Sequence, residues 1–259
     1  MCTLVALHRC TPDASLWIAA NRDEYLDRAA DGPALRMGRA GAVVAPLDRR
    51  AGGTWWGVNA HGVFAAITNR PTRTLDATRR SRGQLVLDAL AHDSVHDATR
   101  ALAALGRDLY NPFNLFVADA SDAAAIVYEA TPRVMPLAPG VHVVGNADPN
   151  AREVAKVRRT LDRAEAVATA PPEHIADGLA EICRSHEAGG DPLASNCVHC
   201  DGYGTRSSTL LRLGHGPSLL RHADGPPCTS PYHDFTPLLA DLGTPAEPRA
   251  GEMATRKAS

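Results

Sequence analysis

Short apolar runs separated by turn residues mark the first 70 positions of the chain, a pattern typical of β-strands. The first two runs cover Thr3 to His8 and Ser15 to Ala20, and Thr11-Pro12-Asp13 lies between them. Thr, Pro and Asp favour turns, so the pattern predicts a β-hairpin that begins at Thr3. Further strands are expected at Ala42 to Ala45, Thr54 to Val58 and Val63 to Thr68.

The spacing of apolar residues becomes helical after residue 80. Apolar positions three and four residues apart predict helices at Leu85 to Leu90, Val95 to Leu105, Ala151 to Thr169 and Glu173 to Ser185. Between and after these helix pairs, short apolar runs again predict strands. These runs are Phe113 to Ala118, Ala124 to Glu129, Val134 to Leu137, Val141 to Val144, Ser207 to Leu213 and Leu219 to His222.

The order of the predicted elements is strands, two helices, strands, two helices and strands. Grouped strands of this kind favour an α+β protein with antiparallel sheets rather than the strict alternation of a nucleotide-binding fold. We expect a four-layer αββα sandwich of two antiparallel sheets, built as a single domain over residues 1–242. Residues 243–259 are rich in Pro, charged and small residues, which predicts a disordered C-terminal tail.

Composition narrows the classes of partner. The chain has 27 basic and 29 acidic side chains, a net charge of -2, which argues against a nucleic-acid-binding protein. It contains no apolar run long enough to span a membrane, and its start does not resemble a signal peptide, so we expect a cytoplasmic protein. Its six cysteines are then expected to be reduced. The oligomeric state stays open.

Cys2 is the candidate nucleophile. A small residue after the initiator permits removal of Met1, which would leave a cysteine with a free α-amine at the start of the chain. The reference pKa values of an α-amine, about 7.7–8.0, and of a thiol, about 8.5, are close enough for proton exchange. One residue would then supply both nucleophile and base. The alternative is a small buried residue at the edge of the first strand.

Charged and aromatic residues near this strand end are further candidates. Arg22 and Asp23 follow the second apolar run, across the hairpin from Cys2. There the arginine would lower the thiol pKa and the carboxylate would hold the α-amine, although such charges also occur in solvated turns. Trp55 and Trp56 stand between glycines and predict either an aromatic-lined pocket or a core pair.

Three other polar residues lie at ends of predicted strands. Asn69 follows one strand and Asn146 another, and their uncharged amides suit an oxyanion, although either is also an ordinary turn residue. Arg206 begins a late strand among hydroxyl-bearing residues and suits a carboxylate or a developing negative charge.

Several segments occur in an order that resembles a known family. They are MCTLV at the start, NRDE at 21–24, GGTWWGVNAHGVFAAITN at 52–69, SRG at 81–83, NPFNL at 111–115, GN at 145–146 and CVHCDGYGTRSST at 197–209. Together they are similar to the NRDE proteins, the family of the eukaryotic transport and Golgi organisation protein 2.

The resemblance implies the fold of the N-terminal nucleophile hydrolases. It also invites comparison with the cysteine-type members of that superfamily, the penicillin V acylases and bile salt hydrolases, which begin with the same Met-Cys-Thr. Carried over by position, the implied catalytic residues are Cys2, Arg22, Asp23, Asn69, Asn146 and Arg206. Arg22 and Asp23 are adjacent here, whereas the acylases separate the corresponding pair, which weakens the assignment of Asp23.

The resemblance implies a cysteine amidohydrolase that acts on a small or acylated amide and needs no cofactor. Trp55, Trp56 and Phe64 would favour an apolar acyl group. Family members have also been connected with haem trafficking and with acyl-CoA or lipid metabolism. The alternative is therefore a non-catalytic haem or acyl-lipid binding protein, with His8, His61, His142 or Cys2 as the residue that ligates haem iron. A structural or pseudoenzyme role is the third hypothesis.

The Cys197-Val198-His199-Cys200 segment contains the elements of a zinc site. Together with Cys183, Cys228 and the histidines it offers enough soft donors for a metal ion. The family pattern around YGTR accounts for this segment without a metal, and no second C-x-x-C occurs. We therefore expect no metal site.

Overall fold

The computed structural model describes residues 2–186 and 190–243. Met1 and residues 244–259 lie outside these ranges. The predicted removal of Met1 and the predicted disordered tail therefore concern residues that are not described.

One antiparallel sheet begins with the N-terminal hairpin. Its strand order is β10-β1-β2-β12-β13-β14, and β11 pairs with β12. The bounds are β1 Thr3–Thr11, β2 Ala14–Tyr25, β10 Gly140–Val144, β11 His199–Cys200, β12 Tyr203–Leu213, β13 Leu219–Ala223 and β14 His233–Asp234. The predicted hairpin turn is confirmed, because Thr11 pairs with Ala14 across Pro12-Asp13.

The second antiparallel sheet is a meander in chain order, β3-β4-β5-β6-β7-β8-β9. Its strands are β3 Ala30–Met37, β4 Ala42–Asp48, β5 Trp56–Asn59, β6 Phe64–Asn69, β7 Phe113–Ala118, β8 Ala123–Tyr128 and β9 Pro132–Leu137. The helices are α1 Gly83–Ala89, α2 Val95–Ala103, α3 Ala155–Ala168, α4 Pro172–Arg184 and α5 Pro237–Asp241, with a 3-10 turn at Pro192–Ala194.

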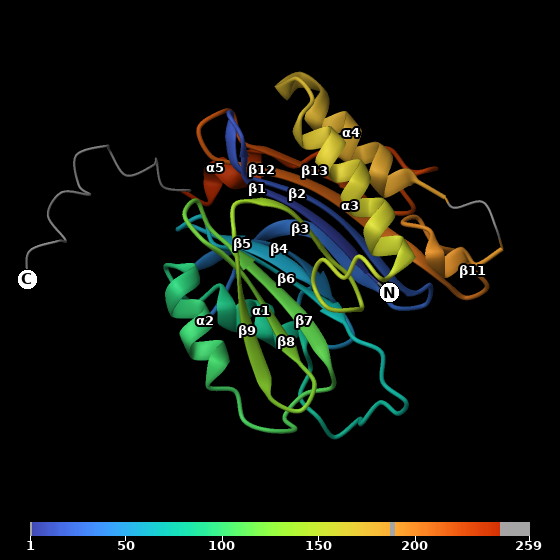
Figure 1. Cartoon of the computed structure of the whole chain (residues 1–259). Helices are drawn as coiled ribbons and strands as arrows, with labels where there is room; N and C mark the ends of the chain where they lie inside the picture. Colours follow the sequence, from blue (N-terminus) through green and yellow to red (C-terminus); the bar gives the residue numbers. More distant parts are fainter. Residues whose placement is uncertain (1, 187–189, 244–259) are drawn as a thin grey trace, which may run out of the picture.

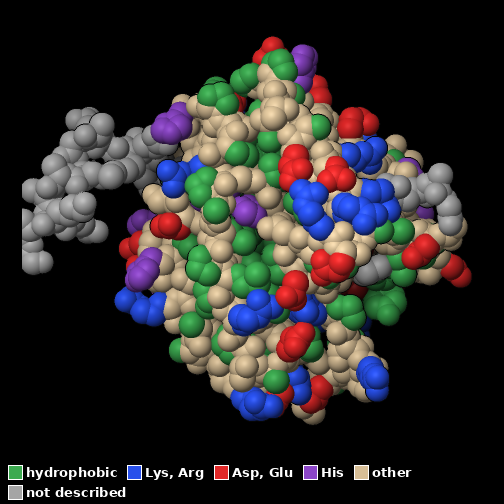
Figure 2. All heavy atoms as spheres, viewed as in Figure 1, with side chains coloured by type: hydrophobic (Ala, Val, Ile, Leu, Met, Phe, Trp, Pro, Cys, Tyr) green, Lys and Arg blue, Asp and Glu red, His purple; other side chains and the backbone are tan. Residues whose placement is uncertain are grey.

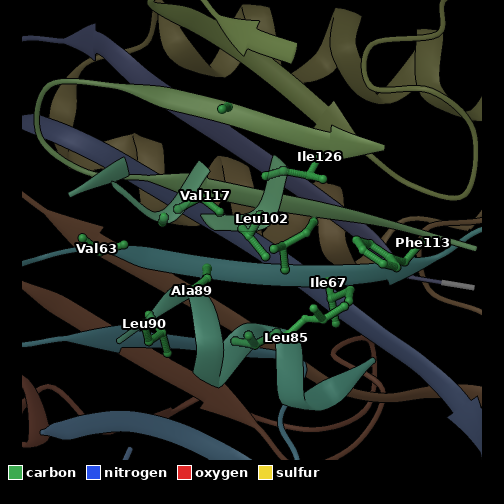
Figure 3. Close-up of a cluster of buried hydrophobic side chains, with 14 of the residues drawn as sticks. Val63, Ile67, Leu85, Ala89, Leu90, Leu102, Phe113, Val117 and Ile126 are labelled. Atoms are coloured by element: carbon green, nitrogen blue, oxygen red, sulfur yellow. The ribbon is translucent and has the colours of Figure 1, made fainter. Parts of the chain in front are cut away.

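Three apolar clusters separate four layers, as expected for an αββα sandwich (Figure 1). Leu85 of α1 and Leu102 of α2 pack on the outer face of the second sheet, against side chains such as Phe113 (Figure 3). Leu16 and Phe64 belong to the cluster between the two sheets. The remaining cluster fills the space between the first sheet and helices α3 and α4.

Side chains of β2 alternate between two of these clusters. Leu16 and Ile18 face the second sheet, whereas Trp17 and Ala19 face α3 and α4. This period of two is the geometry of any strand. It decides which side of the sheet each polar residue at the end of β2 reaches.

Most predicted elements are present, and the differences have physical causes. The strand β3 was not predicted, because it is an edge strand that contains Gly32-Pro33 and alternates with partly exposed residues. The short elements β11, β14 and α5 also lacked an apolar run long enough to detect. Within the described residues, no helix is long and apolar enough to cross a membrane. Basic and acidic side chains are mixed on the face in Figure 2.

Candidate active site

Cys2 lies at the end of the first sheet, just before β1, and shares a cavity lining with Ala155 and Lys156 of the first turn of α3. Its Sγ is 3.8 Å from the backbone oxygen of Asp23. Burial raises the pKa of the Cys2 thiol, while the positive charge of Arg22 acts in the opposite direction. The predicted effect of Arg22 thus has the expected sign, but burial outweighs it. A neutral thiol of this kind needs a base to become a nucleophile.

Arg22 and Asp23 are neighbours in β2 and therefore lie on opposite faces of the sheet. The Arg22 guanidinium carbon lies 4.3 Å from the ring centroid of Trp55, in the space between the sheets. Asp23 faces the other way, towards Lys156 at the start of α3. The two charged side chains, which are adjacent in the sequence, thus lie on different sides of the sheet near Cys2.

The carboxyl group of Asp23 is buried. Thr205 Oγ1 donates a hydrogen bond to Asp23 Oδ1 at 2.6 Å, and Tyr203 donates its hydroxyl proton to the Asp23 backbone oxygen at 3.1 Å. Within the described chain, Asp23 Oδ2 has no hydrogen-bond partner. Burial raises the pKa of Asp23 to about 6, against the lowering effects of Lys156 and of the Thr205 hydrogen bond. An acceptor is thus held next to Cys2 with one oxygen free.

Asn69 and Asn146 meet at the opposite edge of the site. Asn146 Nδ2 donates a hydrogen bond to the backbone oxygen of Asn69 at 2.5 Å. Thr68 and Asn114 hold the same turn by donating hydrogen bonds to Gly145 O at 2.5 and 3.0 Å. Two segments from different sheets are thereby joined, and Asn69 and Asn146 each line a cavity that Cys2 also lines.

A cavity of about 450 Å³ opens on one side of Cys2, and ten of its lining residues are charged. We call it the arginine-lined cavity. Its basic residues are Arg22, Arg28, Arg50, Arg79, Arg80 and Arg82, and its acidic residues are Asp23, Glu24, Asp48 and Asp76. Arg28 pairs with Asp48, and Arg79 pairs with Asp76.

Four arginines of this cavity have no such partner among the described residues: Arg50 and Arg80, which are exposed, and Arg22 and Arg82, which are not. Across residues 2–186 and 190–243, neither Arg22 nor Arg82 forms an ion pair with a carboxylate. Arg82 instead donates a hydrogen bond to Pro112 O at 3.0 Å. Burial lowers the pKa of both guanidinium groups, and the neighbouring Cys2 acts to raise it. Two partly desolvated cations beside a thiol favour a negatively charged ligand or intermediate.

A second cavity, of about 620 Å³, opens on the other side of Cys2, and we call it the apolar cavity. Its apolar residues are Pro71, Val143, Ala147, Val154, Ala155, Val157, Leu193 and Ala194, and its polar residues include Arg70, Asn146, Lys156 and Asp191. Burial lowers the pKa of Lys156, and the charge of Asp23 acts to raise it. Cys2 is therefore the junction between a cationic cavity and an apolar one.

The three aromatic residues proposed for substrate binding have different positions. Trp55 borders the arginine-lined cavity, and both Trp55 and Trp56 border a narrow pocket next to Cys2. The rest of Trp56 is buried, and its ring stacks on Phe64 with centroids 6.3 Å apart. Phe64 is fully buried between the sheets and lines neither cavity, because it continues the apolar face of β6.

Arg206 is not placed beside Cys2. It lies in a β-bulge of β12, between Thr205 and Ser207, and lines a small pocket with Arg22, Trp55 and His222. Its Nε is buried without a hydrogen-bond partner in the described part of the chain. The sequence identified its strand correctly, but a bulge redirects side chains in a way that sequence alone does not reveal.

The histidines considered as haem ligands line neither cavity at Cys2. His8 Nε2 is 3.2 Å from Asp119 O, and His142 Nε2 is 2.8 Å from Ala138 O, so both rings are engaged in the fold. His61 lies at the surface, where its Nε2 is 3.2 Å from Asp93. Among the four candidate ligands, only Cys2 faces a cavity large enough for a ligand.

Close backbone packing explains two of the glycine-containing motifs. A Cβ on Gly53 would lie 2.6 Å from the backbone carbon of Gly83, which is closer than real Cβ contacts allow. At this contact Thr54 N–H donates a hydrogen bond to Gly83 O at 3.2 Å. The contact brings the segments that carry Trp55 and Arg82 together at the arginine-lined cavity.

Sequence reasoning missed two residues of the site. Arg82 lies within the Ser-Arg-Gly motif but received no role, because nothing nearby in the sequence shows that it turns towards Cys2. In the sequence, Lys156 cannot be distinguished from any other charged residue on a helix surface. Only the packing of α3 against the N-terminal hairpin places it in the lining of the apolar cavity together with Cys2.

Comparisons with solved structures support the fold. A Caenorhabditis elegans orthologue of N-acylethanolamine-hydrolysing acid amidase matches with a TM-score of 0.53 and 12% identity, covering 81% of this chain and 92% of that one. A mutant conjugated bile acid hydrolase from Clostridium perfringens matches with a TM-score of 0.57 and 10% identity, covering 92% and 93%. Both share the expected layered fold of the N-terminal nucleophile hydrolases.

Sequence comparisons identify the family. The human transport and Golgi organization protein 2 homolog is 30% identical over 224 residues, covering 76% of this chain and 81% of that protein. The Bos taurus homolog is 32% identical over 228 residues with the same coverage. The sequence profile of the family Transport and Golgi organisation 2 matches residues 1–216. The chain therefore belongs to the Transport and Golgi organisation 2 family.

Proposed function

We propose that the protein is an amidohydrolase in which Cys2, exposed by removal of Met1, is the nucleophile. The observation that carries this proposal is that Cys2 lines two cavities of opposite character. A thiol buried only for packing would have apolar neighbours on every side. Cys2 instead has Arg22, Asp23 and Lys156 around it.

The first chemical step is acyl transfer to sulfur. The free α-amine of Cys2 takes the thiol proton, and Sγ attacks the carbonyl carbon of the amide. Asp23 Oδ2, which has no partner among the described residues, accepts a hydrogen bond from the resulting ammonium group and orients it. The raised pKa of the thiol agrees with a mechanism in which the proton is removed during the attack.

The negative charge that develops on the carbonyl oxygen is stabilised by Asn69 and Asn146. One N–H of Asn146 is already bonded to Asn69 O, so its second N–H is available for the oxyanion. The α-ammonium then returns its proton to the leaving amine, and the C–N bond breaks. Water, deprotonated by the same α-amine, attacks the thioester and releases the carboxylic acid together with the Cys2 thiol.

The two cavities define the substrate class. An apolar acyl chain suits the apolar cavity, and the amine portion would occupy the arginine-lined cavity. Because Arg22 and Arg82 have no carboxylate partner in the described chain, an amine that carries an anionic group would be bound more tightly than a neutral one. We therefore propose an N-acyl amide with an anionic amine portion as substrate.

A matched pair of amides tests this proposal. N-decanoylglycine and N-decanoylethanolamine have the same acyl chain and differ in the charge of the amine portion. We expect hydrolysis of both, with the higher kcat/KM for the glycine conjugate. Intact mass spectrometry should show a chain that lacks Met1 and an acyl adduct on Cys2 when turnover is quenched with acid. Active protein that retains Met1 would contradict the mechanism.

The same apolar cavity also supports the alternative, a protein that binds a hydrophobic ligand without turnover. Haem titration distinguishes the two functions. Tight binding with a shifted Soret band, lost in Cys2→Ala, together with no hydrolysis of either amide, would favour haem handling. Weak binding that Cys2→Ala leaves unchanged would indicate nonspecific burial of the porphyrin.

A further inference from the structure

Four soft donor side chains converge away from Cys2, at the end of the first sheet that carries β11. They are His186 after α4, Cys197 before β11, His199 in β11 and Cys228 in the connection between β13 and β14. Each side chain offers one ligand atom, an imidazole nitrogen or a sulfur, and these four atoms all lie within 4.8 Å of one another. Cys228 is 29 residues away from His199 in the chain, so the fold is needed to bring it to the other three.

The three donors other than His186 lie at distances close to those around a tetrahedral ion. Cys197 Sγ is 3.5 Å from Cys228 Sγ and 3.6 Å from His199 Nε2, and His199 Nε2 is 3.2 Å from Cys228 Sγ. With Zn–S near 2.3 Å and Zn–N near 2.0–2.1 Å, tetrahedral zinc holds two sulfurs about 3.8 Å apart, and a sulfur and a nitrogen about 3.6 Å apart.

We propose that His186, Cys197, His199 and Cys228 bind one Zn²⁺ as a structural site. Two thiolates and two imidazoles complete the tetrahedron, which leaves no open position for water or substrate. On binding, the two thiol protons are released to solvent and the sulfurs ligate the metal as thiolates. A disulfide between the cysteines is a weaker explanation, because it requires about 2.05 Å between sulfurs and gives the two histidines no role.

Strand geometry explains why the ligands are not those of the C-x-x-C pattern. Residues two apart in an extended segment share a face, so Cys197 and His199 point in the same direction. Cys200, the second cysteine of the sequence pattern, is not part of the cluster. The sequence predicts no metal site in part because a second C-x-x-C is absent. That criterion does not apply to the proposed site, whose ligands do not follow the C-x-x-C pattern.

The proposed zinc site also connects to the candidate active site. Cys197 N–H donates to Ser185 O at 3.0 Å, which ties the site to the end of α4. Val198, which lies between the ligands Cys197 and His199, donates its N–H to Thr205 Oγ1 at 2.9 Å, and Thr205 in turn donates to Asp23 at 2.6 Å. Zinc would fix the β11–β12 hairpin and, through it, the carboxyl group beside Cys2.

Metal analysis of the full chain tests the proposal without any substrate. We expect about one zinc per chain by inductively coupled plasma mass spectrometry when the protein is purified under reducing conditions with zinc present. Replacing zinc by Co²⁺ should give visible bands of tetrahedral cobalt and a thiolate-to-cobalt charge-transfer band. Cys228→Ser should lose the charge-transfer intensity of one thiolate and at least tenfold in zinc affinity, and Cys200→Ser should match the wild type.

A second variant covers the case in which Cys228→Ser fails to fold. His186 is exposed, so His186→Ala should keep the fold and still lower zinc affinity at least tenfold. Either of two results would overturn the proposal: reduced wild-type protein that takes up no zinc or cobalt, or His186→Ala and Cys200→Ser that both bind zinc as tightly as the wild type. A Cys197–Cys228 disulfide in freshly purified, zinc-free protein would also count against it.

Discussion

The thiol of Cys2 and the thiols of Cys197 and Cys228 have different neighbours, although hydrogen bonds of the β11–β12 hairpin link the two sites. Cys2 lies between two cavities, with arginine, lysine and carboxyl groups around it. Cys197 and Cys228 lie against each other and against His199. The first arrangement leaves space for a substrate carbonyl, whereas the second leaves space for one ion. The role of a cysteine in this fold is therefore set by what surrounds the sulfur.

Removal of the Cys2 thiol is the sharpest test of that difference. Cys2→Ala should lower amide turnover by about a thousandfold or more, because no other group in the described site can form the thioester. Its melting temperature should stay close to that of the wild type. Cys228→Ser should show the reverse, with a lower melting temperature and measurable turnover in the protein that stays folded. Equal turnover by Cys2→Ala and the wild type would show that Cys2 is not the nucleophile.

Asp23 allows a test by pH. Burial raises its pKa to about 6, so the folded state binds the proton more tightly than the unfolded chain, whose Asp titrates near 3.9. Ionised Asp23 therefore destabilises the fold by an amount that is zero below about pH 4, grows from pH 4 to 6, and reaches at most about 3 kcal/mol above pH 6. Asp23→Asn removes this effect and should also lower turnover.

Urea unfolding at pH 4 and pH 8 measures the effect. Asp23→Asn should leave the free energy of unfolding nearly unchanged at pH 4 and raise it at pH 8. Asp177→Asn, on the exposed surface of α4, is the matched control and should have little effect at either pH. A gain in stability that is the same at both pH values would show that Asp23 is not the titrating group.

Arg82 tests whether the arginine-lined cavity selects charge. Arg82→Gln should raise KM for N-decanoylglycine roughly ten- to a hundredfold, the range expected for one lost charge-assisted hydrogen bond. The KM for N-decanoylethanolamine should change little. Arg49→Gln, which removes an exposed arginine that pairs with Asp31, is the control. An equal effect of Arg82→Gln on both amides would show that the cavity does not discriminate between an anionic and a neutral amine portion.

The smallest expected effect concerns the apolar cavity. Leu193 lines it and is 36% exposed, so Leu193→Asp should be tolerated by the fold. A carboxylate there should lower kcat/KM for a decanoyl amide several-fold, in line with about 1 kcal/mol of lost apolar contact. Acetyl amides, too short to reach Leu193, should be unaffected. A loss shared by both chain lengths would place the acyl group elsewhere.

The sequence predicted the layers of the fold well, because these depend on local patterns. Runs such as Phe113–Ala118 carry the period and length of buried strands, and the structure places β7 over the same residues. The N-terminal hairpin was predictable for the same reason, since its turn residues are adjacent in the chain. The edge strand β3 was missed because it has half-exposed residues and a Gly-Pro pair.

The candidate site was predictable only where a motif marked it. Cys2, Asn69 and Asn146 were identified from strand ends and from the family resemblance, and the structure brings them to one place. Lys156 was not, because its position beside Cys2 depends on how α3 crosses the sheet. Phe64 was misassigned, because an aromatic residue on a strand gives no sign of which face is buried.

The alternation of Arg22 and Asp23 along β2 limits how this part of the chain can change in length. These two consecutive residues place the Arg22 guanidinium on one side of the sheet and the Asp23 carboxylate on the other. Deleting or inserting one residue between Ala20 and Arg22 would exchange the two sides, placing the carboxylate over Trp55 and the guanidinium against Thr205. Two-residue changes would keep the facing but move both groups along the sheet, away from Cys2. In natural variants of this protein, insertions and deletions should therefore occur in the loops. The number of residues between Cys2 and Arg22 should change only through the hairpin turn between β1 and β2.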